Sequence, residues 1–263
     1  MDPSARWQQL LAGPEDTLPL DEAALLIAAH AQPELDVPAE LARLDRLAES
    51  VAGEGADAVS ELLFHRLGIA GNTGDYDDPE NSYLDRVVDR RLGIPISLSV
   101  LMIEVGRRCG VPLEGVGLPG HYLVRDRSDP ETLIDPFGRG RRLDNAACRA
   151  LLRGVAGPGA HLHPAMLAPT GPRATLARML ANLDRAFRRR RDFAGLAWAT
   201  TLRVVIPDQP VPVLVAAAGT FSEMGRFDRA AAVLEAVSAR NDVPEGTADQ
   251  LRAQAVGMRA RLN

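Results

Sequence analysis

The stretch of residues 90–138 constrains the fold most. The apolar residues of its first half have the spacing of a helix, and its second half has the pattern of strands. Pro95 suits the first position of a helix because its missing N–H needs no partner there. Apolar side chains then recur every three or four residues as far as Cys109. Gly110 and Pro112 end this helix and begin an extended stretch. The sequence therefore predicts a central helix followed by two or three strands.

Turn-forming residues at positions 126–130 predict a hairpin centred on Ser128. His121 lies seven residues before Ser128, and Asp135 lies seven residues after it. In a symmetric hairpin such residues oppose each other and share one face of the sheet. We therefore expect His121 and Asp135 within hydrogen-bond distance of each other, with Asp135 mostly buried. A register slip of one residue would separate them.

An imidazole oriented by a carboxylate is the base half of a nucleophilic triad. The third member would lie at the start of the central helix, where free N–H groups favour an anion, and there the sequence offers Ser97. A hydroxyl is a weaker nucleophile than a thiolate, so Ser97 would need His121 within about 3 Å and an oxyanion hole made by helix-start amides. In the alternative, Ser97 only satisfies free amides at the helix start.

Neither cysteine is placed to replace Ser97. Cys109 falls at the C-terminal end of the helix, where the helix dipole disfavours a thiolate, and its spacing marks it as a core residue. Cys148 fits an amphipathic helix after the hairpin. Lysine chemistry is excluded, because all 30 basic residues are arginine. The sequence thus predicts no thiol-based catalysis.

Four short strings carry a resemblance to a known family: DDP at 77–79, NSYL at 81–84, GIPISLS at 93–99 and GLPGH at 117–121. Together with the Asp135-Pro136 pair, they resemble the transglutaminase-like superfamily and, closely, its SirB-type bacterial proteins. That resemblance implies an α+β fold with a papain- or transglutaminase-like core, in which a central helix packs on a small antiparallel sheet, followed by tetratricopeptide repeats. The chain departs from papain-like and transglutaminase enzymes at the helix start, where those enzymes carry a cysteine.

Composition narrows the function classes. A chain of 263 residues with 46% hydrophobic and 25% charged residues can bury a full core in one large or two modest domains. Its net charge of -5 argues against general binding of nucleic acid or of anionic membranes. No segment resembles a signal peptide or reaches the roughly 18 apolar residues of a membrane span. With two cysteines outside any CxxC or secretory spacing, we expect a cytoplasmic protein.

Apolar spacing predicts an N-terminal helical region over residues 15–70 and another helix over residues 79–92. The loop between them carries Asp75, Asp77 and Asp78, and a calcium site is conceivable on the number of oxygens alone. We favour a helix cap at Asp78, which precedes a proline, because the loop lacks the ligand spacing and the closing Glu of an EF-hand.

Glycine and proline cluster over residues 154–172, which predicts a linker. His161 and His163 lie there, but no cysteine or acidic residue follows at a zinc-like spacing. The sequence therefore predicts no metal and no cofactor. It divides the chain into a transglutaminase-like domain with N-terminal helices at 1–153, the linker, and a helical domain at 173–263.

The C-terminal part repeats itself. Four pairs of residues recur at an offset of 34, the tetratricopeptide period: Leu180 with Leu214, Phe187 with Phe221, Phe193 with Phe227, and Ala197 with Ala231. This predicts two helical hairpins with the four phenylalanines packed inside, and a last helix near 247–262 that covers the exposed end. The alternative is a plain helical bundle with the same spacing by chance.

Two functions are compatible with the sequence. The first is a protein-binding or regulatory module that has the transglutaminase-like fold without its thiol chemistry and holds a protein or peptide segment. The second is an amide or ester hydrolase, or an acyltransferase, with Ser97 as nucleophile, His121 as base and Asp135 as orienting carboxylate. The sequence leaves open the choice between them, the substrate or partner, and the oligomeric state.

Overall fold

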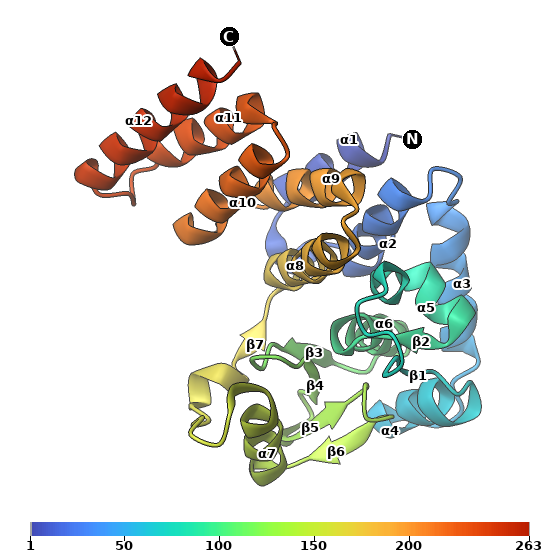
Figure 1. The fold of residues 1–263 in the computed structure, drawn as a ribbon. Coiled ribbons are helices and arrows are strands. Elements are labelled where there is room, and N and C mark those ends of the chain that lie inside the picture. Colours follow the sequence, from blue (N-terminus) through green and yellow to red (C-terminus); the bar gives the residue numbers. More distant parts are fainter. Residues whose placement is uncertain (1, 263) are drawn as a thin grey trace. The chain divides into compact units, whose positions relative to one another are not determined.

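The computed structural model describes residues 2–262, which form two compact units. The first ends at Asn182 and the second begins at Leu183. Helix α8 (Pro172–Arg190) is continuous across this point (Figure 1). The domain division made from the sequence, with its linker at 154–172, stays a prediction.

Helices make up the N-terminal part of the first unit, as the sequence predicts. In chain order they are α1 (Pro3–Ala12), the 3₁₀ turn η1 (Glu15–Thr17), α2 (Leu20–Ala31), α3 (Val37–Glu49), α4 (Gly55–Ser60) and the π-helical turn η2 (Glu61–Arg66). The Asp2 and Asp36 side chains accept backbone N–H groups and cap α1 and α3. Helix α2 is buried along most of its length, which explains why its apolar residues run continuously rather than on one face.

The single helix predicted over residues 79–92 is wrong. The chain forms the 3₁₀ turn η3 (Pro79–Ser82), helix α5 (Leu84–Arg90) and the short strand β2 (Leu92–Gly93), which pairs in parallel with β1 (Ala70–Gly71). The break comes at Tyr83, which is extended, after Asn81 has turned its side-chain amide to the preceding loop. Local side-chain hydrogen bonds thus replace the backbone hydrogen bonds of a continuous helix.

The central helix is confirmed as α6 (Pro95–Arg108), with Pro95 in the first turn. Most of its apolar residues are buried, and Leu98, Leu101 and Met102 have no exposed surface. In Figure 1, α6 lies between strands β3 (Leu113–Val116) and β4 (Leu123–Asp126) on one side and the helices α2, α3 and α5 on the other, and it packs against each of these elements. This position explains why α6 is buried on nearly every face.

A five-stranded antiparallel sheet lies against α6. Its order is β6-β5-β4-β3-β7, with β3 (Leu113–Val116), β4 (Leu123–Asp126), β5 (Asp129–Asp135), β6 (Arg141–Leu143) and β7 (Pro169–Thr170). Helix α7 (Asn145–Ala156) and the 3₁₀ turn η4 (Pro164–Leu167) cover the other face, where Cys148 is buried among the strand leucines. Strand β7 comes from the segment predicted as a linker.

The hairpin of β4 and β5 forms in a register different from the prediction. Symmetry about Ser128 opposes Val124 to Thr132, whereas the structure pairs Val124 with Ile134. The register is irregular between Arg125, which pairs with Leu133, and Asp126, which pairs with Asp129, so the pairs of Val124 and Arg125 lie two residues from the symmetric register on the β5 side. Because side chains alternate with a period of two, a shift of two residues leaves Leu133, Ile134 and Asp135 on their predicted faces.

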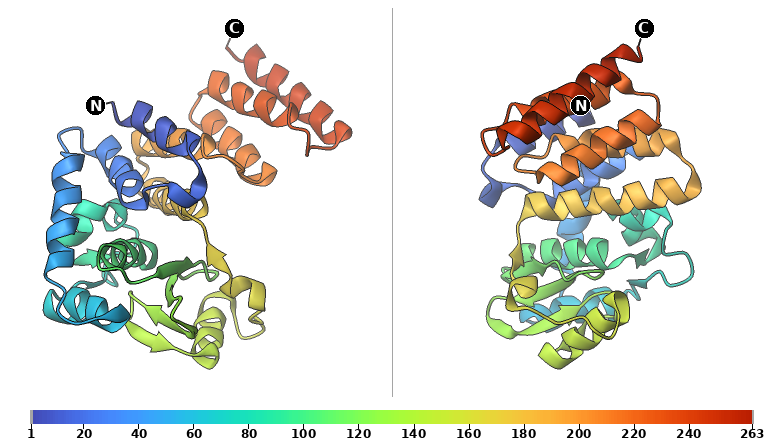
Figure 2. Two further views of the ribbon diagram at one scale, coloured as in Figure 1. Left: turned by 180° about the vertical axis from the view of Figure 1, so that it is seen from behind. Right: turned by 60° about the vertical axis from the view of Figure 1, so that its left-hand side comes forward.

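The second unit is a row of helical hairpins built from the end of α8, α9 (Phe193–Val204), α10 (Val211–Glu223), α11 (Phe227–Ser238) and α12 (Glu245–Ala260). Figure 2 shows α10, α11 and α12, in orange and red, side by side. Phe187 and Phe221 are buried as predicted, but Phe193 is 63% exposed and Phe227 only half-buried. These last two phenylalanines are the first residues of α9 and α11. The tetratricopeptide repeat itself stays a prediction.

Candidate functional site

His121 and Asp135 meet as the sequence predicts. The His121 Nε2 atom lies 2.8 Å from Asp135 Oδ1, and the two residues are 9% and 2% exposed. Asp135 is the last residue of β5, and His121 lies two residues before β4, where its N–H donates to the Leu118 carbonyl. The pair therefore sits at the edge of the hairpin, on the turn that GLPGH forms after β3.

Asp135 is held in its charged form. Burial alone would raise its pKa, but the hydrogen bond from His121, the histidine charge, the Gly138 N–H and Arg141 keep that pKa below its usual value. An ionised carboxylate can only accept hydrogen bonds, so His121 Nε2 must be the donor. In the neutral ring this leaves the lone pair on Nδ1, and no residue of the described part of the chain hydrogen-bonds to Nδ1. The geometry thus orients an imidazole base.

Phe137 connects the pair to the loop before η3. Its ring makes edge contacts with His121 and with Tyr76, with ring centroids 6.0 and 6.1 Å apart. Gly71 lies so close to the Phe137 ring that any Cβ at position 71 would collide with it. A larger residue at position 71 would therefore have to displace the Phe137 ring, which contacts His121.

Two buried asparagines hold that loop in place. Asn72 Nδ2 donates to Asn81 Oδ1 at 2.9 Å, while Asn72 Oδ1 accepts the N–H groups of Gly74 and Asp75. Asn81 Nδ2 donates in turn to the Asp75 carbonyl at 2.7 Å. Sequence reasoning missed both residues, although two asparagines flanking a turn-rich segment were a usable signal.

Asp78 caps η3, as predicted. Its carboxylate accepts the Glu80 N–H at 3.1 Å and pairs with Arg90 at 2.6 Å. Within residues 2–262, no three side chains of the ligand types His, Cys, Asp and Glu gather as a metal site. The Asp78 carboxylate thus has structural partners in η3 and α5.

Ser97 lies in the first turn of α6, but its hydroxyl is used within that turn. The Oγ atom donates to the Asn81 carbonyl at 2.6 Å and accepts the Ile94 N–H at 3.1 Å, and the residue has no exposed surface. Among the described residues, no hydrogen bond joins Ser97 to His121. These bonds match the alternative in which Ser97 satisfies backbone groups at the helix start, while its catalytic role remains a prediction.

The two thiols lie elsewhere. Cys109 is exposed at the end of α6, 3.6 Å from the Ala48 carbonyl, and partial burial raises its pKa. Cys148 is buried under the far face of the sheet, where burial and the charges of Asp144 and Asp135 raise its pKa. Raised pKa values keep both thiols protonated, so neither is an activated nucleophile.

Arg178 of α8 fixes the turn that carries His121. Its Nη2 atom donates to the Leu118 carbonyl at 2.7 Å and to the His121 carbonyl at 2.5 Å, and its guanidinium lies over the Tyr122 ring. Tyr122 in turn hydrogen-bonds Thr175 of α8 at 2.7 Å. Sequence reasoning missed Arg178, because nothing local links it to a turn some sixty residues earlier.

Comparison with known proteins gives matches over most of the chain. The family model for the transglutaminase-like superfamily matches residues 29–181. A UPF0162 protein of Xylella fastidiosa is 38% identical, covering 78% of each chain, and one of Pseudomonas aeruginosa is 35% identical, covering 70% of this chain and 69% of its own. F-box only protein 21 of Mus musculus is 37% identical over 48% of this chain but only 21% of its own length.

No solved structure gives a significant match. Among the described residues, none of the helices has the length and apolar character needed to cross a membrane.

Proposed function

Because the chain belongs to the transglutaminase-like superfamily, among the SirB-type UPF0162 proteins, we propose that it is a protein-binding module that has kept this fold without thiol catalysis. One observation carries the proposal. The hydroxyl at the nucleophile end of the site, that of Ser97, is fully buried and bonded to Asn81 and Ile94. A nucleophile must reach both its base and its substrate, and Ser97 reaches neither.

The surroundings of His121 support the same proposal. Asp135 orients His121, but a base without a nucleophile in reach performs no acyl transfer. The Phe137 ring packs edge-on against His121, and Arg178 donates a hydrogen bond to the His121 carbonyl. Such contacts are those of a structural residue. At the surface nearby, Tyr76 and Arg141 are exposed, and tyrosine and arginine are enriched in protein interfaces.

The similarity to F-box only protein 21 adds a further argument. There the similarity covers about a fifth of a much longer protein, so the core occurs in more than one protein context. A core that combines with different neighbours is expected of a binding module, because its use depends on surface recognition rather than on a complete active site.

The second candidate function is acyl transfer or hydrolysis by Ser97, His121 and Asp135. The observation that favours it is the oriented imidazole, whose Nδ1 has a lone pair available. It requires the first turn of α6 to rearrange so that Ser97 gives up its bond to the Asn81 carbonyl.

Two measurements decide between these functions. A serine-reactive fluorophosphonate is incubated with the whole protein, and adducts are mapped by mass spectrometry; we expect none at Ser97. In a Ser97→Cys variant, iodoacetamide should label Cys109, which is exposed, faster than the new thiol, and His121→Ala should leave both rates unchanged. Labelling at position 97 that is faster than at Cys109 and slowed by His121→Ala would establish the catalytic alternative.

A further inference from the structure

The second unit carries an apolar groove that the His121 site does not use. It has a volume of about 290 Å³ and is formed by α9, α10 and α11. Its side walls are Val204 and Val205 at the end of α9 and Leu214 and Phe221 of α10. Val205 is 40% exposed, although valine normally prefers the interior. The groove therefore leaves apolar surface in contact with water.

One face of α11 is the floor of this groove. Arg229, Ala232, Val233 and Ala236 lie within two turns of α11, and Ala232 and Val233 are each three or four residues from the other two, so the four form one stripe along the helix. Arg240 follows just after the end of α11. Ala232 and Ala236 of the stripe are exposed. Small side chains let a second helix approach closely, because the distance between helix axes depends on the residues at the contact.

The charge of the groove has one sign. Arg229 begins the stripe, Arg240 lines the groove just beyond the other end of α11, and no carboxylate is among the groove-lining residues. Arg240 is engaged by Asp242 at 2.5 Å and by the Gln209 carbonyl at 2.7 Å. Arg229 makes no ion pair or hydrogen bond within residues 2–262. A cation without a counterion beside an apolar surface favours an occupant that brings a carboxylate.

We propose that this groove binds a short amphipathic helix of a partner protein, whose apolar face covers the alanine floor and whose Asp or Glu pairs with Arg229. The inference rests on the proposed binding function and names the kind of partner. Along α11 the stripe from Arg229 to Ala236 spans seven positions, which is roughly 10 Å, or two turns. An open groove of this length suits a helix lying along it, which recognises its site through apolar anchors spaced three and four residues apart.

The test starts from the whole protein and a displayed library of random 16-residue peptides. Enriched peptides are synthesised with a fluorescent label, and their affinity is measured by fluorescence anisotropy. We compare the natural chain with Ala236→Trp, which fills the floor, and Arg229→Glu, which reverses the open charge. Ala253→Trp is the matched control, because Ala253 is an exposed alanine of α12 outside the groove. All three changes are at exposed positions, so the fold should tolerate them.

We expect enriched peptides with apolar residues at helical spacing and at least one acidic residue. Ala236→Trp should weaken their binding roughly tenfold or more, as loss of a central anchor does. Arg229→Glu should weaken it several-fold, and more strongly at low salt, while Ala253→Trp should leave it unchanged.

Three results would overturn the inference: no enrichment, enriched peptides without acidic residues, or binding unaffected by Ala236→Trp. Self-association of the chain that Ala236→Trp abolishes would also overturn it, in favour of a second copy as occupant. A fluorophosphonate adduct at Ser97 concerns only the proposed lack of catalysis and does not alter these binding results, so the two failures can be told apart.

Discussion

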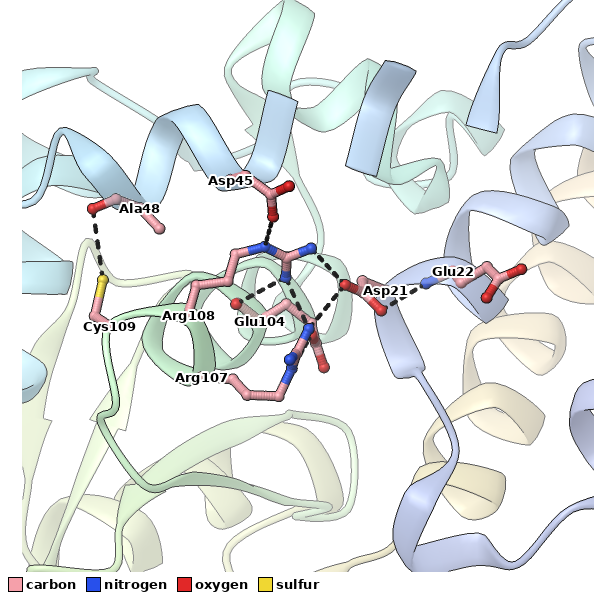
Figure 3. Close-up of polar contacts among 8 residues, drawn as sticks. All are labelled: Asp21, Glu22, Asp45, Ala48, Glu104, Arg107, Arg108 and Cys109. Carbon is pink, nitrogen blue, oxygen red and sulfur yellow. Dashed lines mark hydrogen bonds and ion pairs between the residues drawn. The ribbon is translucent and has the colours of Figure 1, made fainter. Parts of the chain in front are cut away.

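Two buried ionic groups of the first unit differ in what surrounds their carboxylates. Asp135 is alone with its donors, His121, Gly138 and Arg141, and its pKa is lowered although it is buried. Glu104, near the C-terminal end of α6, shares its surroundings with Asp21 (Figure 3). Burial raises the pKa of Glu104 to about 7, and the charge of Asp21 adds to this effect against the opposition of Arg107 and Arg108.

The Glu104 cluster joins three helices. Arg108 donates to Asp21 of α2 at 2.6 Å, to Asp45 of α3 at 2.7 Å and, within α6, to the Glu104 carbonyl at 3.0 Å. Figure 3 shows its guanidinium at the centre of these contacts. Arg107 adds bonds to Glu104 at 2.8 Å and to Asp21 at 3.1 Å. The comparison teaches that one buried carboxylate with its own donors stays charged, whereas two that share donors compete for them.

Removing Arg108 should break this arrangement most severely. Arg108→Ala leaves Asp21 and Glu104 buried together with only Arg107, whose side chain is largely exposed, as their shared cation, and we expect the free energy of unfolding to fall by about 3–5 kcal/mol. Urea unfolding followed by Trp7 fluorescence in a Trp198→Phe background reports on the first unit, because Trp7 is buried there. Arg142→Ala, which removes exposed ion pairs with Asp57 and Asp129, is the control and should cost about 0–1 kcal/mol. Equal losses in both variants would contradict the central role of Arg108.

Asp135→Asn tests the other group. The carboxylate loses its charge while keeping its shape, and we expect a loss of about 2 kcal/mol in unfolding free energy at pH 7, as for a hydrogen bond to a charged group. A lowered pKa means that the native carboxylate stabilises the fold above the usual value of 3.8, and that this contribution disappears as the pH falls through the lower folded value. The difference between native and variant protein should therefore shrink in acid. A difference that grows in acid would refute the charged state of Asp135.

The two groups also differ in how far the sequence predicts them. His121 and Asp135 lie in one hairpin, fourteen residues apart, and side-chain alternation put them on one face even though the predicted register was two residues off. Asp21 and Arg108 are 87 residues apart, so no local pattern relates them.

The same reasoning explains the other outcomes. Helices in the second unit follow from apolar spacing within each segment, whereas the exposure of Phe193 depends on the neighbours that each helix meets. The sequence placed Ser97 at the helix start, but it did not predict the hydrogen bond to Asn81, which forms only through a tertiary contact. Arg178 is a similar case, because the backbone carbonyl to which it donates belongs to a turn that is distant in the sequence.

Glu104→Gln should show the opposite pH dependence. A carboxyl group whose pKa is about 7 in the folded chain and near 4.5 in the unfolded chain takes up a proton on folding between these values. The unfolding free energy of the native protein should thus fall as the pH rises from about 5 to 8, with Glu104 contributing about 2–3 kcal/mol of that fall. Glutamine removes this contribution, so the native-minus-variant difference should become less favourable over that range. A flat difference would show that Glu104 is charged throughout.

Arg141→Ala should have the smallest effect and sharpens the comparison most directly. Arg141 lies 3.4 Å from Asp135, but its side chain is 59% exposed, whereas that of Arg108 is 12% exposed. Solvent screens an exposed pair, so we expect a loss of at most about 0.5 kcal/mol in unfolding free energy. The Asp135→Asn effect should persist in the Arg141→Ala background, because His121 and the Gly138 N–H remain as donors. A double-mutant cycle by urea unfolding measures this. Coupling as large as the Asp135→Asn loss itself would mean that Asp135, like Asp21, depends on a guanidinium, and the distinction between the two groups would fail.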